Sequence, residues 1–356
     1  MIPEPYVTPG PVILLGSGET APNMQKVYTW LFERIAPPVR AAILETPAGF
    51  ELNSGAVAGQ IGRYLEHRLQ NFAPQVTVIP ARKRGTPFSP DEPGIVAPLH
   101  GANVIIAGPG SPTYAVRQLC DSLVWHTLCA RHRLGAALIF ASAVALAASA
   151  MTLPVYEIYK VGEELHWKRG LDFFRPFGLP LIVVSHWNNS DGGDALDTSR
   201  CYMGRSRFEQ LLPLLPGGPD AYTVAGIDEK TALVLDLAHA AARVMGAGGV
   251  TLLRQGAEIR FAHGATFPLA ELGPFALPAP GAGIPPAIWQ AARQAVGAAH
   301  AAAQAQVPAA LAALVEERQA ARARKDWAAS DRLREEIAAQ GWRVSDTADG
   351  PVLEQE

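Results

Sequence analysis

Short apolar runs alternate with amphipathic segments along the first half of the chain. A run of four or five apolar residues fits a strand that is buried on both faces of a parallel sheet, and the longer segments between runs have the spacing of helices that cover such a sheet. The pattern predicts a three-layer α/β/α domain with a largely parallel central sheet. The expected strands are residues 12–15, 41–44, 76–79, 104–107, 137–140 and 181–184, and the expected helices are residues 23–35, 56–69, 113–129, 143–151 and 207–215.

Shorter apolar runs, separated by glycine-rich turns, follow between residues 223 and 261, which is typical of antiparallel strands. The composition changes after Leu272. Five prolines fall between Pro274 and Pro286, and 17 of the 40 residues from 276 to 315 are alanine. We therefore expect a folded domain at residues 1–272, a Pro/Gly/Ala-rich linker with an Ala-rich helix at 273–307, and a small helical tail at 308–356.

Charge is distributed unevenly between these parts. The 356 residues carry 30 Lys and Arg against 33 Asp and Glu, a net charge of −3. Residues 316–356 hold seven of the basic and ten of the acidic side chains, so the tail carries the whole net charge. A neutral body excludes a chain-wide basic surface for nucleic acid, and any such contact would have to be local.

The three cysteines include no Cys-x-x-Cys pair, and the N-terminus lacks the pattern of a secretory leader, so we expect a cytoplasmic protein without disulfides. Cys120 and Cys129 are expected on opposite faces of one helix, and no histidine or cysteine pair has zinc-site spacing, so we expect no metal. The uncharged stretch 134–156 contains polar residues and is interpreted as a buried strand running into a buried helix. We expect no membrane association.

The first strand runs into residues 16–21, Gly-Ser-Gly-Glu-Thr-Ala, which fit the loose G-x-G-x-x-A pattern of dinucleotide-binding loops. Such glycines let the backbone approach a pyrophosphate, and Glu45 ends the next strand where a ribose-binding acid would lie. Any tight strand-to-helix turn in a parallel sheet also favours these residues. A dinucleotide-binding enzyme is therefore kept as a lesser alternative.

Ser142 lies between two alanines, after an apolar strand and before an alanine-rich helix. A strand–turn–helix of this kind can expose a nucleophilic serine above a sheet, although small buried serines also serve as packing residues. His186 follows the apolar strand 181–184, at the edge where α/β folds place ligands, and is the best general base among nine histidines. Asp228 and Glu229 end another strand and are the leading candidates for the acid of a triad.

Together these segments resemble the cyanophycinase and peptidase E (aspartyl dipeptidase) family of serine hydrolases, which have a class I glutamine amidotransferase-like fold. The resemblance covers about residues 12–272, and it rests on the order and spacing of its motifs. The motifs are Gly16-Ser17-Gly18-Glu19, Thr46-Pro47-Ala48, Gly108-Pro109-Gly110-Ser111-Pro112, Ser142, the strand before His186, Arg205 with Arg207, and Gly226-Ile227-Asp228-Glu229.

The resemblance implies hydrolysis of a peptide or amide bond in a small substrate, through an acyl-enzyme and without a cofactor. It also implies a preference for acidic substrates, which would require a cation in the pocket. The implied site residues are Ser142 as nucleophile, His186 as general base, Glu229 as acid, the amides of Gly110 and Ala143 as oxyanion hole, and Arg205 and Arg207 as substrate contacts.

The chain departs from the family pattern beside both catalytic candidates. The glycines two residues from the family's nucleophile are replaced by Phe140 and Val144, and the aspartate and glutamine before its histidine by Val184 and Ser185. These changes put the strained turn and the family's substrate contacts in question. The alternative is a catalytically silent scaffold whose tail binds tRNA or a protein partner.

Over about forty residues the tail resembles the extreme C-terminal segment of cysteinyl-tRNA synthetases, for example in Lys325-Asp326-Trp327. That segment belongs to their tRNA-binding region, but the chain lacks the His-Ile-Gly-His and Lys-Met-Ser-Lys motifs of a synthetase. Acids alternate with the bases, so a solvated helix pair is the other interpretation, and a homodimer is kept open. The candidates for RNA contact are Arg318, Arg322, Lys325, Arg332 and Arg334.

Overall fold

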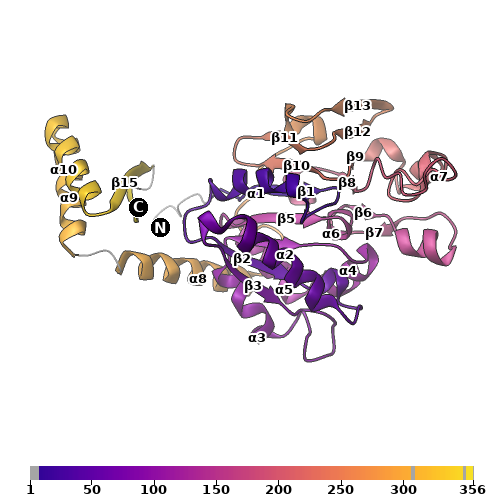
Figure 1. The fold of residues 1–356 in the computed structure, drawn as a ribbon, viewed down its shortest axis with the longest axis horizontal. Coiled ribbons are helices and arrows are strands. Elements are labelled where there is room, and N and C mark those ends of the chain that lie inside the picture. The colour runs from indigo at the N-terminus through magenta and orange to yellow at the C-terminus, as the bar shows by residue number, and fades with distance from the viewer. Residues whose placement is uncertain (1–7, 306–308, 348–349, 356) are drawn as a thin grey trace. The chain divides into compact units, whose positions relative to one another are not determined.

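The computed structural model of the protein describes residues 8–305, 309–347 and 350–355. Contacts within the chain form two compact units, a body that ends at Arg293 and a tail that begins at Gln294. The boundary lies inside helix α8 (Pro286–Ala305), so the three-part division expected from composition stays a prediction. Figure 1 follows the chain through both units.

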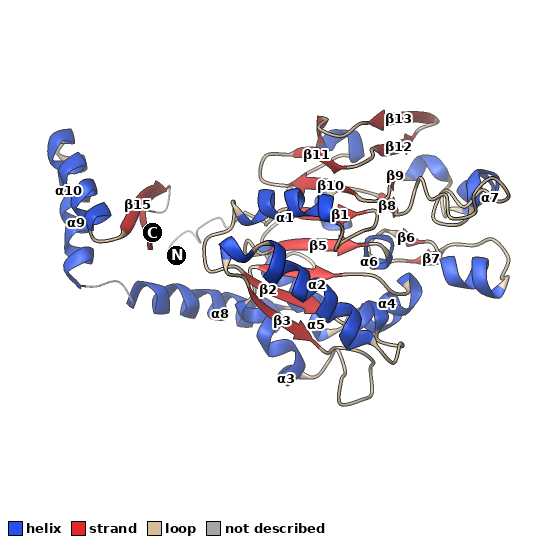
Figure 2. Cartoon of the chain, in the orientation of Figure 1, coloured by secondary structure: helices blue, strands red, loops and turns tan. Residues whose placement is uncertain are grey.

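The body contains a large mixed sheet and a smaller second sheet (Figure 2). Its helices are α1 (Gln25–Phe32), α2 (Ser54–Arg68), α3 (Pro93–Val96), α4 (Pro112–Leu119), α5 (Leu123–Arg133), α6 (Ala143–Ala147), α7 (Gly204–Leu211) and the start of α8. Its strands are β1 (Val12–Leu15), β2 (Arg40–Leu44), β3 (Gln75–Ile79), β4 (Val104–Ala107), β5 (Ala137–Ala141), β6 (Met151–Thr152), β7 (Lys168–Arg169), β8 (Leu181–Val184), β9 (Thr223–Ile227), β10 (Thr231–Asp236), β11 (Ala241–Gly246), β12 (Val250–Arg254), β13 (Ala257–Phe261) and β14 (Thr266–Pro268).

The large sheet has the strand order β14-β11-β10-β1-β5-β4-β2-β3. Five neighbouring strands, from β1 to β3 in this order, run parallel, and β10, β11 and β14 are antiparallel to their neighbours. Central parallel strands are covered on both faces, which is why they appear in the sequence as continuous apolar runs. The fold class expected from the sequence is confirmed.

Alternate residues of the central strands point to opposite faces, and each face packs against its own helices. Ile13 and Leu15 of β1 belong to the cluster with α1 and α2, whereas Val12 and Leu14 belong to the cluster with α4, α5 and α6. All four side chains are at most 1% exposed. This alternation gives the three layers, helix, sheet and helix.

The strand β8, expected as the sixth parallel strand of the large sheet, lies in the second sheet, whose order is β13-β12-β9-β8. Here β8 runs parallel to β9, and the chain returns to the large sheet at β10. An apolar run indicates a buried strand but does not specify its neighbour, so the sequence could not separate the two sheets. The His186 amide after β8 donates to the Gly16 carbonyl after β1 (3.1 Å), which joins the two sheets at their carboxyl ends.

The expected helix 113–129 is two helices, α4 and α5. The hydroxyl of Ser122 accepts a hydrogen bond from the Trp125 amide (3.1 Å) and caps the start of α5. Cys120 lies in the break between the helices, so the prediction that it shares one helix with Cys129 was wrong. The expected helix 143–151 ends earlier, at Ala147.

The described part of the tail contains the end of α8, two further helices and a hairpin. Leu311 and Val315 of α9 (Ala309–Ala323), Ile337 of α10 (Trp327–Ala339) and Val344 of β15 (Trp342–Thr347) form its buried core. The pairing of β15 with β16 (Gly350–Gln355) adds a hairpin to the helical tail that the sequence pattern predicted.

Across the described ranges, no helix combines the length and the apolar character needed to cross a bilayer. The uncharged stretch 134–156 contains β5 and α6, whose residues are buried. The expectation of a buried strand followed by a buried helix is confirmed there.

Candidate active site

Ser142 lies at the sharp turn between β5 and α6. Its backbone has φ 49° and ψ −109°, a conformation that is strained for any residue with a side chain. The Ser142 amide donates to the Leu15 carbonyl of β1 (3.0 Å), and α6 begins at the next residue. The turn therefore has the shape that holds a serine hydroxyl above the end of a sheet.

Phe140 and Val144 lie where the resemblance leads us to expect glycines, and both fit this turn. Phe140 is fully buried, and its ring centroid lies 6.2 Å from that of Trp125 and 5.4 Å from that of Phe173. Val144 is fully buried in the same apolar cluster. Both side chains point into the core below the turn, so the strained geometry at Ser142 forms without flanking glycines.

His186 meets Ser142 from the second sheet. Its Nε2 lies 2.9 Å from Ser142 Oγ, and its side chain is 18% exposed. The backbone of His186 also has a positive φ, 52°, and Ser185 before it donates its hydroxyl to the Ser142 carbonyl (3.3 Å). Because the two sheets meet at the carboxyl ends of their strands, the Ser142 hydroxyl and the His186 imidazole lie within hydrogen-bond distance.

The carboxylate that orients His186 belongs to Glu229 and not to its neighbour Asp228. Glu229 Oε1 lies 2.9 Å from His186 Nδ1, so the ring carries its proton on Nδ1 and accepts the Ser142 hydroxyl at Nε2. Asp228 is 1% exposed, and its Oδ2 accepts from the Gly249 amide (2.8 Å) and pairs with Arg260. Of the two acids expected from the sequence, Glu229 therefore contacts His186, and Asp228 makes structural contacts within the body.

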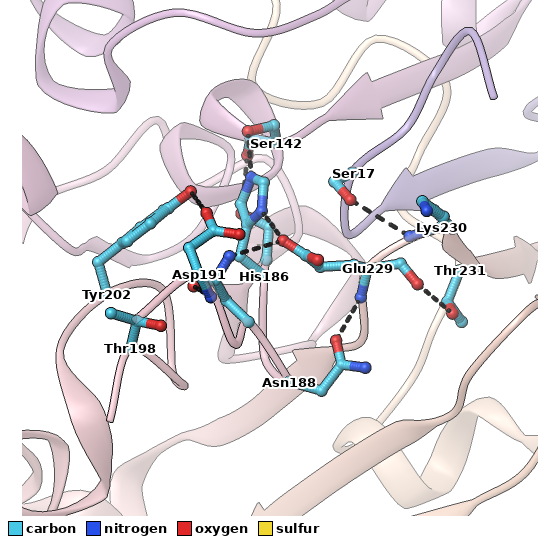
Figure 3. A network of polar contacts seen from close by, with 12 residues as sticks. Ser17, Ser142, His186, Asn188, Asp191, Thr198, Tyr202, Glu229, Lys230 and Thr231 are labelled. Atoms are coloured by element: carbon cyan, nitrogen blue, oxygen red, sulfur yellow. Dashed lines mark hydrogen bonds and ion pairs between the residues drawn. The ribbon is translucent and has the colours of Figure 1, made fainter. Parts of the chain in front are cut away.

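Two asparagines after His186 also contact Glu229, and Figure 3 shows the first of them, Asn188. Asn188 Oδ1 accepts from the Glu229 amide (2.7 Å), and Asn189 Nδ2 donates to Glu229 Oε1 (2.9 Å). The sequence analysis assigned neither asparagine a role in the site. Their position directly after the histidine was the available signal, but no pattern within the sequence pairs them with a residue 40 positions away.

Tyr202 and Asp191 form a second polar pair beside the imidazole. The Tyr202 hydroxyl donates to Asp191 Oδ2 (3.0 Å), and the Tyr202 ring centroid lies 5.9 Å from that of His186. Hydrogen bonds from Asn189 and Tyr202 lower the pKa of Asp191, and burial raises the pKa of Tyr202. Asp191 is therefore ionised at neutral pH, a feature that the sequence analysis did not identify.

Gly110 follows β4 and lies against the loop after β2. Its φ is 144°, and a Cβ at this position would collide with the Pro47 carbonyl, so only glycine fits. No hydrogen bond found among the described residues uses the amide of Gly110 or of Ala143, the first residue of α6. Both amides remain available, and their role as oxyanion donors stays a prediction.

Gly16 and Glu45, which suggested a dinucleotide-binding site, both make structural contacts within the body. Gly16 lies so close to the Asp228 carbonyl that a Cβ would collide with it, and its amide donates to Thr231 (2.9 Å). Glu45 is 4% exposed and pairs with Arg82 (2.6 Å). Close packing against Asp228 therefore accounts for this glycine, and the ion pair with Arg82 accounts for this acid. Over the described residues, no three His, Cys, Asp or Glu side chains are grouped to hold a metal ion.

The two candidate substrate arginines have different surroundings. Arg207 donates through its guanidinium to the carbonyls of Met203 (2.7 Å) and Tyr202 (2.9 Å), which gives it a structural role. Arg205 is exposed and lines a cavity of about 280 Å³, together with Trp187. None of the three triad candidates lines this cavity, and substrate contact by either arginine stays a prediction.

The tail arginines expected to contact RNA are not equally accessible. Arg318 is 3% exposed, and its two terminal nitrogens lie 2.8 Å from the two carboxylate oxygens of Asp346. Arg322 also pairs with Asp346 (3.3 Å), and Arg334 pairs with Asp331 (3.4 Å). Arg318 therefore belongs to the interior of the tail, whereas Lys325 and Arg332 are exposed and form no ion pair within the described residues.

We expect the Arg318–Asp346 pair to make tail stability depend on acid pH. Hydrogen bonds from Arg318 lower the pKa of Asp346, so the contribution is complete above the ordinary carboxyl pKa and is lost as pH falls through the lower, folded value. Asp346→Asn should destabilise the tail by about 1–2 kcal/mol at pH 7, less than for a fully buried pair because Asp346 is 40% exposed. Amide hydrogen-exchange protection in α9 measures this, and the difference in protection between the two proteins should begin to narrow at about pH 4 and close below the lowered pKa of Asp346. A difference that does not change between pH 7 and pH 2 would contradict the pairing.

Comparison with known proteins separates the chain into two parts. The family model of the cysteinyl-tRNA ligase anticodon binding domain matches residues 304–350. Cysteine–tRNA ligase 1 of Burkholderia lata is 57% identical over 47 residues, which are 13% of this chain and 10% of that protein. Cysteine–tRNA ligase of Streptococcus thermophilus is 62% identical over 37 residues, 10% of this chain and 8% of that protein. The chain thus spans about a tenth of the length of the curated relatives it matches.

The body is similar to solved peptidase structures. A peptidase from an acI-B1 Actinobacterium has a TM-score of 0.58 and 23% sequence identity, over 74% of this chain and 98% of that chain. A putative peptidase E protein from Listeria monocytogenes EGD-e has a TM-score of 0.40 and 13% identity, over 72% of this chain and 99% of that chain. The first similarity shows that the body has a peptidase-like fold.

Proposed function

We propose that the body is a serine-type peptidase or amidohydrolase that cleaves a peptide or amide bond in a small substrate. The observation that carries the proposal is the pair of 2.9 Å contacts that joins Ser142 Oγ through the His186 ring to Glu229. The strained turn at Ser142 supports it, because such strain persists where the surrounding structure enforces it and is concentrated at functional sites. The peptidase-like fold of the body is consistent with this chemistry.

In the proposed reaction the Ser142 oxygen attacks the substrate carbonyl while His186 Nε2 takes the hydroxyl proton. Glu229 stabilises the imidazolium that forms, and the amides of Gly110 and Ala143 donate to the developing oxyanion. The carbon–nitrogen bond breaks as His186 returns the proton to the leaving amine. Water, deprotonated by His186, then releases the acyl group and regenerates Ser142.

The test is covalent labelling with a fluorophosphonate probe, followed by mass spectrometry of the peptides. A serine activated by an imidazole reacts with such a probe, whereas a hydrogen-bonded but unactivated serine does not. We expect one label per chain, on Ser142. Folded protein that takes up no label would favour the alternative of a catalytically silent scaffold.

We propose tRNA binding as a second function, located in the tail. The match of residues 304–350 to an anticodon binding domain favours it. Lys325 and Arg332 are exposed, and Trp327 between them in sequence is 57% exposed. Exposed basic side chains can contact the phosphates of an RNA, and an exposed aromatic ring can stack on its unpaired nucleobases.

Reversing these two charges should weaken tRNA binding by the full-length protein. We expect Lys325→Glu with Arg332→Glu to lower the affinity about tenfold and to reduce the salt dependence of binding by about two counterions. Gel shifts over a series of salt concentrations measure both quantities. The control is Lys26→Glu with Arg63→Glu, an equal charge change at exposed residues of the body. Equal loss in the two double variants would remove the specific role of the tail.

A further inference from the structure

A tight turn directs two side chains at one oxygen of Glu229. The Asn189 amide donates to the His186 carbonyl (3.1 Å), which places these residues at the two ends of the turn. His186 Nδ1 and Asn189 Nδ2 both lie 2.9 Å from Glu229 Oε1. One carboxylate oxygen therefore accepts from the imidazole and from a carboxamide that the same turn supplies.

Asn189 and Glu229, which are joined by this hydrogen bond, differ in how firmly their side chains are held. Asn189 is 3% exposed, and its own Oδ1 accepts from the Asp191 amide (3.2 Å), so both ends of its carboxamide are bonded. The Glu229 side chain is 30% exposed and has three rotatable bonds, which makes it costly in entropy to hold in one orientation. The buried asparagine is the fixed group, and the glutamate is the group that needs to be held.

The neighbouring residue, Asn188, holds the main chain of Glu229. Its Oδ1 accepts from the Glu229 amide at 2.7 Å. With the backbone fixed at one point and Oε1 at another, the carboxylate has little freedom to turn away from the imidazole. Both bonds come from the two residues that close the turn begun at His186.

We propose that Asn189 is a positioning residue of the site, which holds Glu229 Oε1 against His186 Nδ1. The proposal rests on the proposed hydrolase function, and Asn189 acts through Glu229 without touching the reacting atoms. A flexible, partly exposed glutamate then orients the imidazole as well as a shorter, buried acid would. The loss of Asn189 should therefore matter only while Glu229 carries a carboxylate.

The test is a double-mutant cycle on the rate of fluorophosphonate labelling of Ser142 in the full-length protein. We expect Asn189→Ala to slow labelling about 10- to 100-fold, and Glu229→Gln to slow it further. Adding Asn189→Ala to Glu229→Gln should cause no additional loss, because residues that act as one unit give non-additive effects. Asn53→Ala, a change at an exposed asparagine before α2, is the matched control and should label at the wild-type rate. If the two single losses multiply in the double variant, Asn189 has only a general structural role and the proposal is overturned.

A second measurement separates this proposal from the hydrolase proposal. The proton on His186 Nδ1 should give a low-field NMR resonance, which reports the bond to Glu229 whether or not Ser142 reacts. We expect this resonance in the wild type and in Asn53→Ala, and its loss in Asn189→Ala. Wild-type protein that resists labelling would reject the hydrolase alone, whereas an unchanged resonance in Asn189→Ala would reject the positioning role.

Discussion

Replacing Ser142 by alanine should abolish covalent labelling by a fluorophosphonate and reduce hydrolysis by about 10⁴-fold or more. The substitution removes only the hydroxyl group. No other serine or threonine among the described residues contacts His186 Nε2. The surrounding packing should persist, because alanine keeps the Cβ and Ser142 is anchored through its amide to Leu15. Labelling stoichiometry by intact-mass spectrometry measures the first effect, and release of product from a dipeptide library measures the second.

Ser17 provides the control for this substitution. It lies in the same polar network (Figure 3), where its hydroxyl accepts from the Lys230 amide (3.2 Å) without contacting the imidazole. Ser17→Ala should therefore retain labelling. Undiminished labelling of Ser142→Ala would place the reactive group elsewhere and contradict the assignment of the nucleophile.

Much of this site could be predicted because its residues follow strands that the sequence shows clearly. Ser142 directly follows the apolar run of β5, His186 follows that of β8 by two residues, and the two sheets meet at the carboxyl ends of their strands. The acid was less certain, because Asp228 and Glu229 are adjacent and both follow β9. The resemblance implied Glu229, and in the structure Glu229 contacts His186 whereas Asp228 is buried and pairs with Arg260.

The features that could not be predicted depend on contacts between distant residues. The placement of β8 in a second sheet depends on its pairing with β9, about 40 residues later in the chain. Arg318 looked like a basic surface residue until its contact with Asp346, 28 positions away, placed it inside the tail. Likewise, the strained turn forms with Phe140 because its ring packs against two rings from other segments, Trp125 and Phe173, which also contact each other. The local sequence pattern predicts helices and strands and where they end, but it does not predict which distant residues they contact.

Glu229→Gln should slow labelling and hydrolysis by about 10³- to 10⁴-fold while leaving the fold intact. A carboxamide of the same size can occupy the position between His186 and Asn189, but it cannot stabilise the imidazolium that forms when the ring takes the Ser142 proton. A carboxamide nitrogen turned toward the ring would also favour the tautomer with its proton on Nε2, which cannot accept from Ser142. The rate constant for fluorophosphonate labelling measures the combined loss.

The adjacent acid gives the sharpest comparison. Asp228→Asn removes the buried carboxylate that pairs with Arg260 and should lower the thermal midpoint, with a loss of stability smaller than the about 3–5 kcal/mol of a fully buried pair because the Arg260 side chain is 55% exposed. Its labelling rate per folded molecule should stay near the wild-type value, because Asp228 does not contact His186. Glu229→Gln should show the reverse, a normal thermal midpoint and slow chemistry. Glu229 would then act on the imidazole, and Asp228 would stabilise the junction between β9 and β12. Equal labelling rates in the two variants would show that Glu229 has no role in the reaction.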